Sequence, residues 1–169
     1  SSAASDVYKR QMYNDLVLTA IRRRLQGECI EKEDKRGYEL LKGSRFLVLT
    51  SPKRLHEKEM AARDNNRFLN ENYARKGLSF PPGARLRRIG TENKLHDLLA
   101  ANSDLSVAYT LLDQFNYAYD VTSEDIMSKG LQQWYRLANQ SKVPEILKFV
   151  NTIKSHEDGL INSVQSKNF

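Results

Sequence analysis

The sequence contains one good candidate for a β-strand, Arg45 to Thr50 (RFLVLT), and this candidate limits what the chain can fold into. The run is short and apolar, and Gly43 and Ser51-Pro52 bound it, which is typical of a strand. One strand cannot satisfy its own backbone hydrogen-bonding groups and therefore needs partner strands. Because no second good candidate occurs, we expect an incomplete sheet and a truncated domain.

Apolar residues recur at helical spacing through most of the remaining sequence, so we expect a mainly α fold. The first predicted helices cover Met12 to Leu25, with Gly27 just past the end, then Glu57 to Arg75, and then the region from Leu95 to Tyr119. A cap at Thr122 or Ser123 begins the next helix, and its expected apolar face comprises Ile126, Leu131, Trp134, Leu137 and Ala138. Pro144 suits the first turn of the last helix, whose expected inward side chains are Ile146, Leu147, Val150, Ile153, Leu160 and Ile161.

The first eleven residues, SSAASDVYKRQ, have neither apolar periodicity nor a helix cap, and they lack the apolar run of a signal peptide. They match the translation of a sequencing-library adapter, in which a transposon mosaic end encodes Asp6 to Gln11. We therefore interpret residues 1–11 as an adapter-like scar that is not native, with a disordered natural terminus as the alternative. On the first interpretation, Met12 is internal to a longer reading frame.

The chain is basic, with a formal net charge of +6 and a pI near 9.4. Without residues 1–11 it has 25 basic and 20 acidic side chains, a net charge of +5, which favours a polyanionic partner. Two clusters contribute to this excess: Arg22, Arg23 and Arg24 in one, and Arg85, Arg87 and Arg88 in the other. A solvated face is the alternative for both, and by composition alone the more frequent one; the first cluster also suits the last turn of a helix, where cations are stabilised by the helix dipole.

No catalytic constellation can be identified from the residues alone. The three histidines, His56, His96 and His156, are far apart in sequence, and Cys29 is a single thiol, so neither a metal site nor a disulfide is expected. Phosphate-binding loops, dinucleotide fingerprints and serine elbows are absent. No apolar run approaches the roughly 20 residues of a membrane span, so we expect a cytoplasmic protein without a membrane partner. Trp134 lies on an apolar helix face, which favours a core position over base stacking.

Four blocks of the sequence, in this order, resemble a known family: "MYNDLVLTAIRRRLQ", "LLKGSRFLVLTSPKRL", "LLAANSDLSVAYTLLDQFNYAY" and "WYRLANQSKVPEILKFVNTIKSHEDGLINS". They are similar to the DDE transposases of bacterial insertion sequences, whose RNase H-like catalytic domain is interrupted by a helical insertion. The resemblance covers about Met12 to Phe169 and is weakest over Ala61 to Asn93. It implies that residues 12–52 are a piece of the RNase H-like core, one helix and one strand, and that residues 53–169 form the helical insertion region.

The resemblance also implies which catalytic groups to look for. In this family an Asp-Arg-Phe-His segment carries the second catalytic aspartate, and an Asn-rich "EGxNN" stretch carries the final glutamate. The adapter-like segment occupies the place of the former, and the place of the latter lies after Phe169. We therefore expect no catalytic and no metal-binding residue in this chain. The intact parent is expected to cleave and join DNA strands with Mg²⁺, and the fragment itself to be inactive.

The family resemblance adds residues to the DNA-binding candidates, because insertion domains of related transposases often place a Trp and basic residues near flanking DNA. Here these candidates are Trp134, Arg136, Lys142, Lys148 and Lys154. The partner implied is DNA, at insertion-sequence ends and target sites, in the bacterial cytoplasm, and the oligomeric state stays open. A complete small basic helical protein that binds DNA or another partner is the alternative function.

Overall fold

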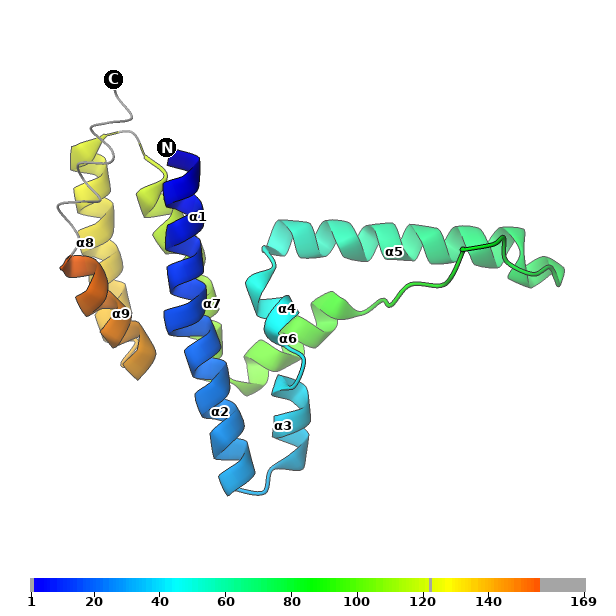
Figure 1. Cartoon of the computed structure of the whole chain (residues 1–169), viewed down its shortest axis with the longest axis horizontal. Coiled ribbons are helices and arrows are strands. Elements are labelled where there is room, and N and C mark those ends of the chain that lie inside the picture. Colours follow the sequence, from blue (N-terminus) through cyan, green and yellow to red (C-terminus); the bar gives the residue numbers. More distant parts are fainter. Residues whose placement is uncertain (1, 122, 156–169) are drawn as a thin grey trace. The chain divides into compact units, whose positions relative to one another are not determined.

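The structure is a computed structural model that describes residues 2–121 and 123–155. Every regular element in these residues is a helix, which confirms the mainly α fold (Figure 1). The chain divides into two compact units, one formed by residues 1–42 and 99–169 and the other by residues 43–98. Within the described residues, no helix is both long enough and apolar enough to cross a membrane.

A long helical run opens the first unit. It comprises α1 (Ser2–Tyr13), the π-helical stretch η1 (Asn14–Thr19) and α2 (Ala20–Glu31), and the backbone keeps helical angles at both junctions. The run continues through Gly27, so the end predicted there is wrong. A helical Gly costs only about 1 kcal/mol relative to Ala, and α2 packs against α3 (Lys35–Leu41), an interaction of the kind that offsets such a cost. The reversal falls instead at Glu33, which has a positive φ of 56°.

Residues 2–11 lie within α1, although the sequence showed no helical pattern there. Helix propagation adds one hydrogen bond for each residue fixed, so a helix anchored by buried Tyr13 can extend toward the N-terminus. Lys9 is buried in this helix. A helical conformation does not test whether residues 1–11 come from an adapter sequence, so their non-native origin stays a prediction.

Four aromatic rings form the centre of the first unit. They come from α1, α7 (Ser103–Tyr119), α8 (Glu124–Gln140) and α9 (Pro144–Lys154). Ring centroids lie 5.0 Å apart for Phe115 and Trp134, 5.1 Å for Tyr13 and Phe149, and 5.5 Å for Phe115 and Phe149. The polar ring atoms are bonded as well, since the Tyr13 hydroxyl donates to the carbonyl of Ala108 at 2.6 Å. Burial raises the pKa of Tyr13 far above its usual range, so the phenol stays protonated.

The last two helices follow the predicted pattern in their caps and in most of their buried faces. The Ser123 hydroxyl accepts a hydrogen bond from the backbone N–H of Ile126 at 3.4 Å, and Pro144 occupies the first turn of α9. Two members of the expected α8 face are exposed, Ile126 at 60% and Leu137 at 38%, whereas Met127 and Tyr135, which the pattern did not include, are buried. Thr122, Leu160 and Ile161 lie outside the described residues.

The second unit contains the region predicted as a strand, and that prediction is wrong. Residues Arg45–Leu49 form the short helix α4. Without partner strands, the backbone is satisfied locally, through hydrogen bonds such as those from the N–H of Val48 to the carbonyl of Ser44 and from Thr50 to Phe46. Tertiary burial of Leu47 and Val48 overrides their strand propensity. Among the described residues, 12–52 contain no strand, and their assignment to an RNase H-like core stays a prediction.

The rest of the second unit is one long helix and a segment that returns along it (Figure 1). Helix α5 (Pro52–Asn72) begins at an N-cap, where the Ser51 hydroxyl accepts a hydrogen bond from the N–H of Arg54. The 3₁₀ turn η2 (Ala74–Lys76) follows, then an irregular stretch up to Gly90, then α6 (Thr91–Ala101). The predicted helix at Glu57 to Arg75 is confirmed with an earlier start and an earlier end.

Candidate nucleic-acid interface

The net positive charge of the chain is confined to the second unit. Residues 43–98 hold twelve Lys and Arg against six Asp and Glu, whereas the rest of the chain holds fifteen of each. The first unit is therefore formally neutral and the second carries +6. Sequence analysis missed this division because the charge has to be counted within unit boundaries, and those boundaries come from the fold.

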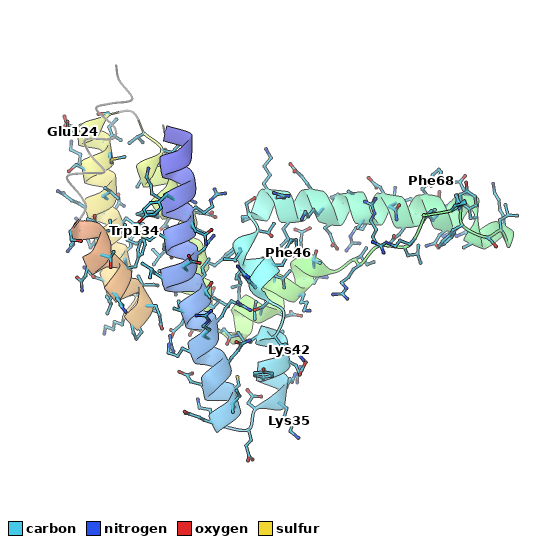
Figure 2. The ribbon with its side chains drawn as sticks, viewed as in Figure 1. Lys35, Lys42, Phe46, Phe68, Glu124 and Trp134 are labelled. Carbon is cyan, nitrogen blue, oxygen red and sulfur yellow. The ribbon has the colours of Figure 1, made fainter. Side chains whose placement is uncertain are left out.

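The chain reverses direction at the C-terminal end of α5. Gly77 has a left-handed φ of 71°, and Gly83, which follows Pro81 and Pro82, has a φ of 81°. Three rings pack at this turn: the Tyr73 centroid lies 6.3 Å from that of Phe68 and 6.4 Å from that of Phe80. Figure 2 marks Phe68 near this end of α5. The turn brings residues 84–90, which include three arginines, back beside the helix.

Two asparagines of α5 bond the backbone of the returning segment. The Asn66 side chain makes a two-point contact with Arg87: its Nδ2 donates to the Arg87 carbonyl at 2.8 Å, and its Oδ1 accepts from the Arg87 N–H at 2.7 Å. The Nδ2 of Asn65 donates to the carbonyl of Arg85 at 3.0 Å and to the Asn66 Oδ1 at 3.1 Å. The two side-chain amides thus bind backbone groups of the segment in the way that the backbone of a neighbouring strand would.

A buried carboxylate fixes the end of the same segment. Glu59 of α5 is only 3% exposed, and its carboxylate accepts hydrogen bonds from the N–H of Gly90 at 2.7 Å and from the N–H and hydroxyl of Thr91 at 3.3 and 2.9 Å. The Arg63 guanidinium lies 3.2 Å from the same carboxylate. The bond from Gly90 is the largest of the effects that lower the pKa of Glu59, so the group is ionised at neutral pH.

The arginine side chains of the segment are exposed. Within the described residues, no acidic side chain forms an ion pair with Arg85, Arg87 or Arg88. Neighbouring arginines on α5 differ, because Arg63 pairs with Glu59 and Arg67 with Asp64. The segment therefore presents three unneutralised guanidinium groups on a backbone that is held in place, an arrangement that suits phosphate oxygens.

The other arginine cluster is divided among three environments. Arg24 is the centre of an ion-pair network: its guanidinium lies 2.8 Å from Glu145, 2.8 Å from Asp104 and 3.1 Å from Glu28. The hydrogen bonds to Glu145 are the main reason that the pKa of Arg24 is raised above its ordinary value. Arg22 is buried and donates to the carbonyl of Leu41 at 3.4 Å, while Arg23 is exposed. Arg22 to Arg24 do not form a common surface.

Trp134 lies in the aromatic core of the first unit. Its ring is 2% exposed, and its Nε1 donates to the carbonyl of Leu111 at 2.9 Å (Figure 2). Neither ring face is open to a base in this conformation. The four nearby cations are exposed on or beside α8 and α9, and the Lys154 ammonium lies 5.2 Å from the Tyr135 ring centroid; they are Arg136, Lys142, Lys148 and Lys154.

The described residues contain no group of three or more His, Cys, Asp or Glu side chains that could hold a metal ion. Asp104 is engaged with Arg24, and His56 lies 2.9 Å from Glu92 at an exposed site. Burial, followed by nearby Asp34 and Glu28, raises the pKa of the Cys29 thiol, which disfavours the nucleophilic thiolate.

Comparison with known proteins identifies the family. A model of a transposase family, the DDE transposases of the ISL3 group, matches residues 10–168. No curated protein and no solved structure matches the chain. The match spans both units and includes the basic segment beside α5. The chain belongs to the ISL3 group of DDE transposases.

Proposed function

We propose that this chain contributes DNA binding to a transposase that cleaves and joins DNA strands at the ends of a mobile element. The observation that carries the proposal is the set of three exposed arginines, Arg85, Arg87 and Arg88, on a segment whose backbone is fixed to α5. They belong to the unit that holds the whole net charge of the chain. The transposase family supports DNA as the partner.

Binding through these groups is expected to be electrostatic and independent of sequence. Each neutralised phosphate of duplex DNA releases condensed counterions, so log affinity falls with log salt at a slope of roughly −0.9 per phosphate. With about three to five phosphates contacted, the slope is expected near −3 to −4, and most binding disappears near physiological salt. The exposed cations Arg136, Lys142, Lys148 and Lys154 belong to a formally neutral unit and are proposed as secondary contacts.

We also propose that the chain alone neither cleaves nor joins DNA. The sequence contains neither an Asp-Arg-Phe-His nor an EGxNN motif, to which the family resemblance assigns two of the three catalytic carboxylates. By that resemblance, three such carboxylates in the parent enzyme would hold Mg²⁺, which would supply Lewis-acid chemistry for strand cleavage and joining. Incubation of duplex DNA with the purified chain and Mg²⁺ or Mn²⁺ is expected to leave the DNA intact. Nicking that is lost when an acidic residue of the chain is mutated contradicts this proposal.

A salt titration with labelled duplex DNA tests the DNA-binding proposal. Replacing Arg85, Arg87 and Arg88 together by Ala is expected to reduce the slope of log affinity against log salt by about two to three. The matched control replaces Lys35, Arg36 and Lys42 by Ala, three exposed cations on α3 and its C-cap, of which Figure 2 marks Lys35 and Lys42. The control removes the same charge from the neutral unit. An equal loss in both variants, or tight binding to one sequence that resists salt, contradicts the proposal.

A further inference from the structure

We propose that Asn65, Asn66 and Glu59 are positioning residues that hold Arg85, Arg87 and Arg88 as a preformed edge for the phosphates of duplex DNA. The inference rests on the proposed function, because it explains how the same arginines are presented. It concerns three uncharged or buried side chains that make no DNA contact themselves. Their contribution is the conformation of the segment before DNA arrives.

The hydrogen bonds define which way the segment faces. The carbonyl of Arg85 and both backbone groups of Arg87 point toward α5, because Asn65 and Asn66 bind them. In an extended chain, backbone groups of alternate residues point to the same side, and side chains of alternate residues share a face. The Arg85 and Arg87 side chains therefore fall on one face of this stretch.

The two attachment points match in length. Glu59 and Asn66 are seven residues apart on α5, which corresponds to about 10.5 Å along a helix at 1.5 Å per residue. Their partners, Gly90 and Arg87, are three residues apart, and an extended chain covers about 10 Å in three residues. The segment is therefore tied to α5 at two points, Arg87 and Gly90, which holds the backbone that carries its arginines beside the helix.

The spacing of the arginines suits a duplex. Residues two apart in an extended chain are separated by about 6.6 Å. Consecutive phosphates of one strand of B-DNA advance by about 3.4 Å along the helix axis and also turn around it, so neighbouring phosphates lie about twice that rise apart. Arg85 and Arg87 can thus address neighbouring phosphates of one strand. An unclamped loop has to lose its conformational freedom on binding, which lowers affinity.

The test uses a change that removes no charge. The double variant Asn65→Ala, Asn66→Ala keeps all three arginines, and the matched control Asn70→Ala, Asn72→Ala removes two amides from the same helix. Asn72 donates to the carbonyl of Phe68 within α5, and among the described residues it forms no hydrogen bond with the returning segment. The first variant is expected to bind labelled duplex DNA about three- to tenfold more weakly at low salt, with a salt slope flatter by about one. The control is expected to bind as the unmodified chain does.

Hydrogen exchange shows whether the variant acts in the intended way. Exchange at the Arg87 amide is expected to accelerate in the Asn65→Ala, Asn66→Ala chain while the melting temperature stays within a few degrees. A faster exchange with unchanged DNA affinity overturns the inference, and so does an Arg87 amide whose exchange does not change.

The Arg85, Arg87 and Arg88 triple variant separates the two levels of the proposal. If the triple variant loses binding and the asparagine variant does not, the positioning role fails while the proposed function stands. If the triple variant retains its DNA binding, the proposed function is contradicted, and the positioning role, which rests on it, is contradicted as well.

Discussion

The two units use arginine in opposite ways. In the first unit, Arg24 forms ion pairs with three carboxylates and joins α2 to α7 and α9. Its charge is therefore neutralised within the fold. In the second unit, the backbone groups of Arg85 and Arg87 are bonded to α5, and the side chains of Arg85, Arg87 and Arg88 are exposed to solvent. Two basic clusters that look alike in the sequence thus have different roles, and the positions of distant acidic residues decide which role each takes.

The largest effect is expected in the aromatic core of the first unit. Replacing Trp134 by Ala removes a ring that contacts Phe115 and Phe149 and removes the side-chain hydrogen bond to the Leu111 carbonyl. Large-to-small changes of buried aromatic residues cost about 3–5 kcal/mol, so the free energy of unfolding should fall by that amount. Denaturant unfolding measures it, with Ile126→Ala as an exposed control on the same helix. A loss of DNA affinity without a loss of stability supports a base-stacking Trp134 and contradicts the core role.

A smaller effect is expected at the ion-pair network. Arg24→Ala leaves Glu145, whose side chain is only 13% exposed, without its main partner, and should cost about 1–2 kcal/mol of unfolding free energy. Arg24→Lys should recover only part of this, because an ammonium lacks the planar fork that binds Glu145 and Asp104 together. Thermal melts of both variants check the order. Arg23→Ala is the matched control, and an equal destabilisation there contradicts the network.

The smallest effect is a pH dependence confined to the second unit. Glu59 has a pKa below its ordinary value of 4.5, and its contribution to stability is therefore fully present above that value. It is lost as the pH falls below 4.5 and through the lowered pKa of the folded state, because protonation weakens the bonds from Gly90, Thr91 and Arg63. Amide exchange at Gly90 between pH 6 and pH 3 measures this loss. Glu59→Gln should remove the pH dependence, and an unchanged profile contradicts the assignment to Glu59.

Much of the helical architecture could be predicted because its signals are local. Ser123 caps α8 and Pro144 opens α9 from positions that the sequence alone identifies. The burial of Trp134 also follows from its place on an apolar face. Arg45 to Thr50 was misjudged because strand propensity is a weak preference, which burial of Leu47 and Val48 in α4 overrides.

The candidate site was only half predictable. The exposed arginines of the second cluster follow from composition, but the clamp that holds them depends on side chains 20 and 21 residues away in sequence, Asn65 and Asn66. Asparagine is common in helices and loops alike, so nothing local marks these two. Arg24 shows the same limit, because its partners Asp104 and Glu145 are 80 and 121 residues distant.

The asparagine clamp also bears on solubility. Asn65 and Asn66 bind backbone groups of Arg85 and Arg87, whereas no hydrogen bond from α5 to the backbone of the intervening Leu86 occurs in the described residues. An open edge of extended backbone is a template for pairing with another chain, which leads to aggregation. Like-charged arginines along such an edge repel a second copy of it. The side chains that suit a phosphate backbone therefore also protect the segment against self-association. Neutralising them should weaken DNA binding and also make this protein more prone to aggregate.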